Sequence, residues 1–408
     1  MLAPEPFFEP RGTPFSEYHR IKALVEDGHT VDLVTYPFGR DVDLPGLRII
    51  RALKPPFMRR VPIGPSFRKI VLDVLLTLTA LRIALFSRQR YDVVHSHEEA
   101  GVLGVWLSRR LGIPHLYDMH SSLPQQLANF RYSKSRLLSW CFERAEHQMV
   151  HGSQVVITIC QDLQDTVQAM GAGDRAVLIE NVMGGDVEPV PGPGRAAIRA
   201  QFGVGGSQPL VLYTGTFEKY QGLDLLIDAA VRLRQDVPEV VVLVVGGSPD
   251  QVAATRERAV AADAPLLFAG QRPPHEIPHF VEACDVLVSP RISGTNTPLK
   301  IYSYLRSGRP IVATNLRTHT QVLSDASAML VEPTADALAT GLRRVLTDDA
   351  ERARLVGNAG RLAEDQYSRH SYVARTRRAY DMLVTGRTTA PTTVPVTGQA
   401  ASGGRDSR

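Results

Sequence analysis

Cationic and neutral hydrogen-bond donors gather in residues 285–316, which read DVLVSPRISGTNTPLKIYSYLRSGRPIVATNL. The apolar ends of this stretch, 285–290 and 311–314, are typical of buried parallel strands. The polar residues between them would lie at the carboxyl end of the first strand, where open α/β sheets bind their ligands. Donors of this kind at that edge indicate chemistry on an anion such as a phosphate.

A helix is predicted between these two strands. Thr297 would be its N-cap, Pro298 its first helical residue, and Gly308 would end it. Such a helix start directs free N–H groups into the crevice, with Lys300 one turn further on, and this predicts a phosphate site. An ordinary strand–helix–strand unit with a solvated lysine is the alternative that the stretch leaves open. The candidate ligand-binding residues here are Arg291, Thr295, Asn296, Thr297, Pro298, Leu299, Lys300 and Ser303.

Two more candidate loops are predicted in the first half of the chain, each after a strand. In the loop 11–13, the missing side chain of Gly12 would let the backbone approach a bound anion. In the loop that begins at 118, His120 could donate to a sugar hydroxyl or a phosphate at neutral pH. A simple tight turn and a structural histidine bonded to a neighbouring carbonyl are the respective alternatives.

The fourth candidate loop is YTGTFEKYQG, residues 213–222. Gly215 follows a predicted buried strand and would let the chain turn into a phosphate pocket, where Thr216, Lys219 and Gln221 are the available donors. No carboxylates or histidines stand at the spacing of metal ligands. The sequence therefore predicts a metal-free site that stabilises a departing phosphate with protein donors. His95 and His97 are expected to pack at a strand end.

The order of predicted elements gives an α/β fold with two doubly wound domains that face a cleft. The first domain would occupy 1–185, followed by a linker, 186–195, that is rich in proline and glycine (DVEPVPGPGR). The second would occupy 196–368. A helix at 369–384 would cross back to the first domain, and the tail 385–408 is expected to be disordered. The apolar start, Met1–Ala3, resembles the end of a first strand, so the natural chain is expected to begin earlier.

Composition narrows the class of protein. The 408 residues carry a net charge of +4, from 46 Lys+Arg against 42 Asp+Glu, which is too small to argue for nucleic-acid binding. Three cysteines suggest neither a disulfide framework nor a zinc site. The start MLAPEPFFEP has neither the basic residues nor the apolar region of a signal peptide. A reducing, cytoplasmic setting is expected.

One apolar run, IVLDVLLTLTALRIALF at 70–86, is shorter than a bilayer requires and is predicted to be a buried helix. The segment before it, 54–69, mixes Arg59, Arg60, Arg68 and Lys69 with aromatic residues. This mixture could make a peripheral contact with anionic lipid at the inner face of the membrane. A solvated loop before a core helix is the alternative.

The chain from 1 to 383 resembles a retaining glycosyltransferase of family 4, with the GT-B fold. The matching segments, in order, are FSEYHRIKALVEDGHTVDLVT, YDVVHSH, LGIPHLYDMHSS, LVLYTGTFEKYQGLDLLIDAA, VVLVVGG, FAG, HFVEACDVLVSPR and LKIYSYLRSGRPIVAT. The resemblance implies a nucleoside-diphosphate sugar held by the second domain, an acceptor on the first, and no divalent metal or other cofactor. By position it places Gly12 near the donor phosphates, His120 near the transferred sugar and Lys300 near the diphosphate.

Four positions depart from the family pattern. Thr216 and Gln221 stand where many members have arginine and lysine, and Thr295 and Ser303 stand where two glutamates bind sugar and ribose. These changes remove charge-assisted bonds to phosphate and a bidentate acceptor for ribose hydroxyls. The cations that could compensate are Lys219, Arg291 and Lys300.

The predicted function is transfer of a sugar, with retention, to an envelope glycan or a lipid-linked acceptor. The leaving β-phosphate would help to deprotonate the acceptor hydroxyl. The four departures keep open an inactive sugar- or nucleotide-binding homologue. An epimerase or phosphorylase of the same architecture is the weaker alternative.

Overall fold

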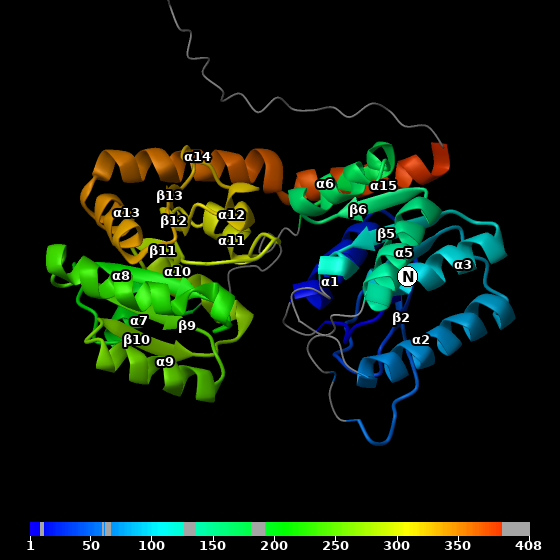
Figure 1. Cartoon of the computed structure of the whole chain (residues 1–408), viewed down its shortest axis with the longest axis horizontal. Coiled ribbons are helices and arrows are strands. Elements are labelled where there is room, and N and C mark those ends of the chain that lie inside the picture. The colour runs from blue at the N-terminus through cyan, green and yellow to red at the C-terminus, as the bar shows by residue number, and fades with distance from the viewer. Residues whose placement is uncertain (9–11, 59–60, 62–66, 126–135, 181–191, 386–408) are drawn as a thin grey trace, which may run out of the picture.

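Two parallel sheets form the framework of the protein (Figure 1). The computed structural model describes residues 1–8, 12–58, 61, 67–125, 136–180 and 192–385. Within them, one sheet has seven strands in the order β3-β2-β1-β4-β5-β6-β7, and the other has six in the order β10-β9-β8-β11-β12-β13. Both sheets are parallel throughout and doubly wound, which confirms the predicted α/β fold.

The first sheet belongs to the N-terminal domain. Its strands are short, and four of them are buried along their whole length because helices cover both faces, although three of these four carry polar as well as apolar side chains. The strands are β1 (Leu2–Ala3), β2 (Val31–Thr35), β3 (Leu47–Arg51), β4 (Val94–His97), β5 (His115–Met119), β6 (Val155–Thr158) and β7 (Ala176–Leu178). The helices are α1 (Gly12–Glu26), α2 (Phe67–Phe86), α3 (Gly101–Leu111), α5 (Arg136–Gly152) and α6 (Gln161–Ala169), with short 3-10 turns at Glu98–Ala100 and Gly173–Arg175.

The second sheet belongs to the C-terminal domain, with one core on each face. The strands are β8 (Leu210–Thr214), β9 (Val241–Val245), β10 (Leu266–Gly270), β11 (Val286–Ser289), β12 (Ile311–Thr314) and β13 (Met329–Val331). The helices are α7 (Arg195–Gln201), α8 (Leu223–Asp236), α9 (Pro249–Ala261), α10 (Ile277–Ala283), α11 (Lys300–Arg306), α12 (Arg317–Thr320), α13 (Ala335–Thr347) and α14 (Asp349–Tyr367), with 3-10 turns at Lys219–Gln221 and Pro274–Glu276.

The strand order reverses once in each sheet, between β1 and β4 and between β8 and β11. Loops that leave neighbouring strands on opposite sides of such a point open a crevice, which is where doubly wound sheets bind ligands. The loops after β8 and β11 are two of the four predicted from sequence. The loop after β5 carries His120, and α1 begins at Gly12 in the connection that follows β1.

The last helix, α15 (Arg369–Thr385), packs on the N-terminal domain, as predicted. It follows α14 after an extended residue, Ser368, and the two helices run nearly end to end along the top of Figure 1. Its residues Tyr372 and Ala379 share a core with Leu116 of β5 and Val155 of β6. After the second domain, the chain therefore returns to the first domain, where α15 covers part of one face of the sheet.

Some predictions about elements were wrong. Gly12 and Thr13 are the first residues of α1 and not part of a loop, and Arg11 lies outside the described residues. The helix α2 is buried on one face only, since Leu72 and Leu76 lie in the core whereas Val74 and Leu78 are exposed. Five α-helices and strands, β3, α6, α7, α12 and β13, were not predicted at all. Among the described residues, no helix is both long and apolar enough to cross a bilayer. Residues 186–191 of the predicted linker and 386–408 of the predicted tail also lie outside them.

Candidate active site

Lys300 and Gly215 meet at the reversal point of the second sheet. The Lys300 ammonium donates to the Thr214 carbonyl oxygen over 3.1 Å and lies 4.0 Å from the centre of the Tyr213 ring. Gly215 has φ +148, and a Cβ there would be 2.9 Å from the Tyr213 hydroxyl and 3.6 Å from the Lys300 ammonium. Only glycine suits this backbone, which leaves the lysine next to an open strand end.

The Lys300 side chain has no acidic partner among the described residues. Burial holds the pKa of its ammonium well below the usual value, and the Arg291 guanidinium lowers it further. A cation in this situation is costly unless an anion binds beside it. The geometry therefore suits a phosphate oxygen at Lys300, as the sequence predicted, while the contact itself stays a prediction.

The start of α11 differs from the prediction. The helix begins at Lys300, and Leu299 occupies the N-cap position without a side-chain cap bond, so Thr297 is not the N-cap. Pro298 and Leu299 form a turn, in which the Pro298 carbonyl accepts from the Ile301 amide over 2.9 Å. The Ser303 hydroxyl donates back to the Lys300 carbonyl over 2.8 Å. Lys300, which was predicted to lie one turn into the helix, is therefore its first residue.

Arg291 holds the loop after β11 in place. Its Nη1 donates to the Asn296 carbonyl over 2.6 Å and to the Thr318 hydroxyl over 2.7 Å, and its guanidinium carbon lies 4.8 Å from the Tyr220 ring centre. A Cβ at Gly294 would come within 3.1 Å of that guanidinium. Arg291 is thus already bonded to protein, and direct phosphate binding by it stays a prediction.

The loop after β8 places its three predicted donors differently. Thr216 and Lys219 are exposed, whereas Gln221 is buried and its amide lies 3.5 Å from the Thr216 hydroxyl. The Gln221 carbonyl oxygen has no hydrogen-bond partner among the described residues. The Thr216 carbonyl accepts from the Tyr213 hydroxyl over 2.7 Å, which fixes the turn after Gly215.

Asn296 joins the two domains. Its amide donates to the His120 carbonyl over 3.2 Å, and its carbonyl oxygen lies 3.5 Å from the Cys160 sulfur. Beside it, Gln321 donates to the Thr295 carbonyl over 2.6 Å and accepts from the Asp162 amide over 2.8 Å. The loop predicted to bind the donor therefore also contacts the loop that carries His120.

A cavity of about 130 Å³ lies at this junction. The side chains around it come from both domains: Thr13, His120, Ile159, Cys160, Asn296, Thr297, Leu299 and Tyr302. The structure thus brings together His120, Asn296, Thr297 and Leu299 from the predicted set, and Thr13 stands next to Gly12. The remaining predicted residues, with Gly12 in the first domain and the others in the second, are not among the residues around this cavity.

Behind His120 lies a buried group of charged side chains that the sequence did not reveal. The Asp118 carboxylate is 3.1 Å from Arg20 Nε, 3.2 Å from His120 Nε2 and 3.5 Å from His95 Nε2. Burial alone would raise the pKa of Asp118, but Arg20 and His120 hold it well below the usual value. Burial likewise opposes the charge of His120, yet Asp118 raises its pKa above the ordinary value.

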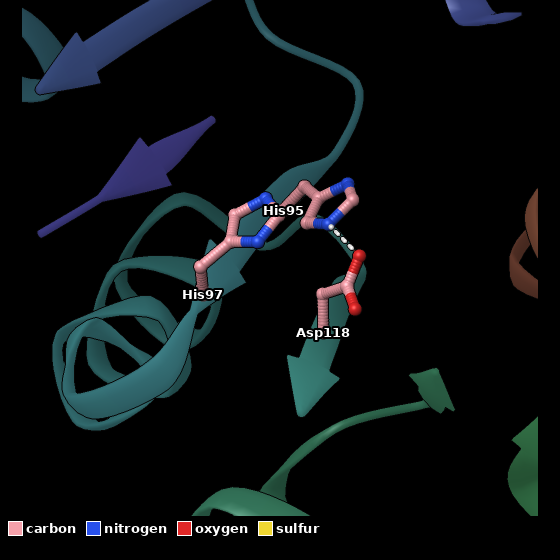
Figure 2. A group of neighbouring side chains, drawn as sticks. All are labelled: His95, His97 and Asp118. Atoms are coloured by element: carbon pink, nitrogen blue, oxygen red, sulfur yellow. Dashed lines mark ion pairs between the residues drawn. The ribbon is translucent and has the colours of Figure 1, made fainter. Parts of the chain in front are cut away.

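His95, His97 and Asp118 lie close enough to suggest a metal site, since one ligand atom of each is within 4.8 Å of the others (Figure 2). The two imidazole rings stack with centres 4.7 Å apart, and the dashed line in Figure 2 joins His95 to Asp118. Arg20 already donates to this carboxylate, and its charge would repel a divalent cation. We therefore interpret the group as a charge network, and metal independence stays a prediction.

Sequence reasoning missed Arg20, Cys160, Gln321 and Tyr380. Each lies far along the chain from the residue that it contacts, so no local motif contains both partners. The one available signal was the Asp-x-His spacing at 118–120, because residues two apart in a strand point to the same face. His95 and His97 were predicted to support the cleft, and both do lie beneath His120.

Comparison with known proteins accounts for both halves of the chain. Residues 18–181 match the glycosyl transferase 4-like domain, and residues 194–362 match glycosyl transferases group 1. Phosphatidyl-myo-inositol mannosyltransferase of Mycobacterium tuberculosis is 25% identical over 398 residues, which is 94% of this chain and 96% of the relative. D-inositol 3-phosphate glycosyltransferase of Corynebacterium aurimucosum is 26% identical over 305 residues, covering 70% and 69% of the two chains.

Solved structures agree in fold. Sucrose-phosphate synthase from Thermosynechococcus elongatus superposes with a TM-score of 0.71 at 20% identity, covering 95% of this chain and 99% of that one. HepE of Anabaena in complex with UDP gives a TM-score of 0.71 at 16% identity, covering 94% and 98%. With both domains matched in sequence and the whole architecture matched in structure, the chain belongs to the glycosyltransferases of the GT-B fold.

Proposed function

We propose that the protein transfers a sugar from a nucleoside diphosphate to a hydroxyl of an acceptor, with retention of the anomeric configuration and without a divalent metal. The donor diphosphate lies at Gly215 and Lys300 of the second domain. The acceptor lies on the first domain, near His120. The leaving β-phosphate takes the proton of the acceptor hydroxyl, so no carboxylate base is required.

The observation that carries this proposal is the Lys300 ammonium at the reversal point of the second sheet, which has no acidic partner in the part of the chain that the structure describes. A diphosphate supplies the missing negative charge, and the glycine at 215 leaves room for it. Support for a uridine nucleotide comes from HepE of Anabaena, which was solved with UDP and with UDP-glucose. The four departures from the family pattern do not favour any one nucleotide or sugar.

The acceptor class is a lipid-linked or envelope glycan. Support comes from the relatives named for phosphatidyl-myo-inositol, a phospholipid. The exposed apolar face of α2 and the basic residues beside it would bring the first domain to the cytoplasmic surface of a membrane. Of the basic segment 54–69, Arg59 and Arg60 lie outside the described residues, and Arg68 is exposed.

The direct test is incubation with a panel of nucleotide sugars, following hydrolysis and transfer by mass spectrometry, with and without EDTA. We expect turnover of at least one donor, unchanged by EDTA. Lys300→Ala should weaken donor binding by about 1.5 to 3 kcal/mol, as for a lost hydrogen bond to a charged group. Lys22→Ala, which removes a lysine paired with Glu26 on α1, is the matched control.

Binding without turnover would favour the inactive homologue. Equal donor affinity in the Lys300→Ala and Lys22→Ala variants would exclude the assigned phosphate site. Loss of turnover in EDTA, restored by a divalent cation, would contradict metal independence.

A further inference from the structure

The Asp118 carboxylate is held from behind by the last helix of the chain. On α15, the Tyr380 hydroxyl lies 2.6 Å from His95 Nδ1, and the Thr376 hydroxyl accepts from Arg20 Nη1 over 3.0 Å. The Tyr372 ring centre lies 5.0 Å from the Arg20 guanidinium carbon. Arg20 and His95 are the two groups that approach Asp118 Oδ2. Three side chains of α15 therefore hold Arg20 and His95, the two groups that lie next to the Asp118 carboxylate of β5.

This arrangement determines which nitrogen of His95 carries the proton. The Tyr380 hydroxyl can donate to Nδ1 or accept from it, and the Asp118 carboxylate beside Nε2 favours the hydrogen on Nε2, which leaves Nδ1 as the acceptor. Burial lowers the pKa of His95 to about 4, so the ring is neutral at pH 7. Its Nε2 lies 3.5 Å from Asp118 Oδ2 without hydrogen-bond geometry, so the carboxylate acts on this nitrogen by electrostatic attraction.

The protonation of His120 follows in the same way. Its Nε2 lies 3.2 Å from Asp118 Oδ1 and 3.4 Å from His97 Nδ1. Burial holds the pKa of His97 well below the usual value, so that ring is neutral and can accept. Both neighbours demand a hydrogen on His120 Nε2. The other nitrogen, Nδ1, is buried, has no partner among the described residues, and belongs to a ring in the cavity wall.

We propose that Arg20, His95 and Tyr380 are positioning residues, which hold Asp118 so that His120 keeps its Nε2–H on the protein and offers Nδ1–H to the ligand in the cavity. Offered in this way, a protonated His120 is a charged donor for a hydroxyl or phosphate oxygen. The other groups that face His120 are Glu98 from the end of β4, Glu5 after β1, and His97. Where Glu98 and Glu5 are ionised they favour the charged form, as Asp118 does, although burial raises the pKa of both.

The identity of the ligand rests on the proposed function, but the state of the two histidines does not. We would therefore record the ¹⁵N and ¹³Cε1 NMR signals of the histidines in the full chain without ligand, as a function of pH. His120→Gln and His95→Gln variants assign the signals. We expect His95 as a single Nε2–H tautomer, and His120 with a pKa above 6.5 that falls by about 1 to 3 pH units in Asp118→Asn.

Tyr380→Phe tests the helix itself. It keeps the ring and removes the hydroxyl, so His95 should become a mixture of tautomers. The control is Tyr117→Phe, which removes a buried hydroxyl that has no hydrogen-bond partner in the described residues, one position before Asp118. That variant should leave the His95 signals unchanged. Thermal melting of each variant checks that the fold is retained.

In the enzyme assay, Tyr380→Phe should lower kcat about 2- to 10-fold, as expected for one hydrogen bond, with the KM for the donor unchanged. Asp118→Asn should move the alkaline limb of the pH–rate profile to lower pH, because His120 would lose its proton sooner. An unchanged His120 pKa in Asp118→Asn, or an unchanged His95 tautomer in Tyr380→Phe, would overturn the inference. If the histidine NMR signals behave as expected but the protein turns over no donor, the result would instead count against the proposed function.

Discussion

Glu5 and Glu17 are two buried carboxyl groups in the N-terminal domain that lie close enough to affect each other's pKa. Burial raises the pKa of Glu17 to about 8, and burial together with Glu17 raises that of Glu5 well above the usual value. The folded protein therefore holds protons here that the unfolded chain releases near pH 4.5. Between that pH and the folded pKa, the unfolded state binds fewer protons, so stability falls as the pH rises.

Glu17→Gln should remove much of this dependence, because the amide keeps the shape and a hydrogen-bond donor without titrating. We expect its melting temperature to exceed that of the wild type by about 2 to 8 °C at pH 8, and by much less at pH 5. Differential scanning calorimetry across this range makes the comparison. Glu364→Gln, on the exposed side of α14, is the matched control. A constant difference between Glu17→Gln and wild type at all pH values would contradict the raised pKa.

At this scale the sequence was informative where the chemistry is local. Gly215 and Lys300 could be predicted because a glycine at a strand end and a lysine after a polar loop are recognisable within a few residues. The surroundings of Asp118 could not, because Arg20 reaches it from α1, and Tyr380 contacts its neighbour His95 from the opposite end of the chain. The N-cap at Thr297 was predicted from residue type alone, and the Pro298–Leu299 turn delays the helix to Lys300.

Among the elements, α2 shows why an apolar composition alone does not predict that a helix is buried. Its apolar residues fill a whole helix, and a helix that is apolar all round is normally buried. Leu72 and Leu76 do enter the core, whereas Ile70, Val74 and Leu78, spaced four apart, form an exposed stripe. Both tryptophans of the chain, Trp106 on α3 and Trp140 on α5, are also exposed on neighbouring helices. Tryptophan is enriched where proteins meet the membrane interface.

The exposed stripe predicts binding to anionic bilayers. Val74→Glu combined with Leu78→Glu places two charges on it, and we expect vesicle affinity to fall by about 10-fold or more. Sedimentation with vesicles of mixed anionic and neutral lipid measures this, and a blue shift of tryptophan fluorescence reports burial of Trp106 or Trp140. Val260→Glu, on exposed α9 of the other domain, is the control. Equal sedimentation of all three proteins would end the membrane proposal.

The strands and most helices could be predicted from the spacing of apolar residues and from the glycine and proline residues between them. Buried parallel strands, for example, are short apolar runs bounded by glycine and proline. The misses have physical reasons. The strand β3 reads LRIIR, with charges at positions that an edge strand leaves in water. The helix α6 has few apolar residues, because only Leu163 and Val167 reach the core. The strand β13 has three residues and is half-buried.

At the scale of the whole molecule, access to the cavity depends on how far apart the two domains lie. The cavity of about 130 Å³ is smaller than the roughly 300 Å³ of a small ligand pocket. Bonds from Asn296 to the His120 carbonyl and from Gln321 to the Asp162 amide hold its walls together. Arg317 adds an ion pair to Asp165 across the same junction. We infer that the domains must part before a nucleotide sugar can enter.

One substitution should allow a disulfide that holds the two domains together. Asn296→Cys places a thiol opposite Cys160, whose sulfur lies 3.5 Å from the Asn296 side chain. We expect the oxidised variant to lose donor binding and the same protein to recover it after reduction, at least 10-fold, as measured by calorimetry. Adding Cys141→Ser removes the exposed cysteine and prevents links between molecules. Equal donor affinity in the oxidised and reduced forms would show that entry needs no opening here.

The position of α15 also bears on how the protein is made. The N-terminal sheet leaves the ribosome before the C-terminal one, but the helix that covers Leu116, Val155 and Ile157 is synthesised after both. Until then, one face of that sheet is exposed and the Arg20 guanidinium lacks Thr376. Exposed apolar surface on a partly folded domain promotes aggregation. A fragment that ends before α15 would therefore carry an uncovered sheet face.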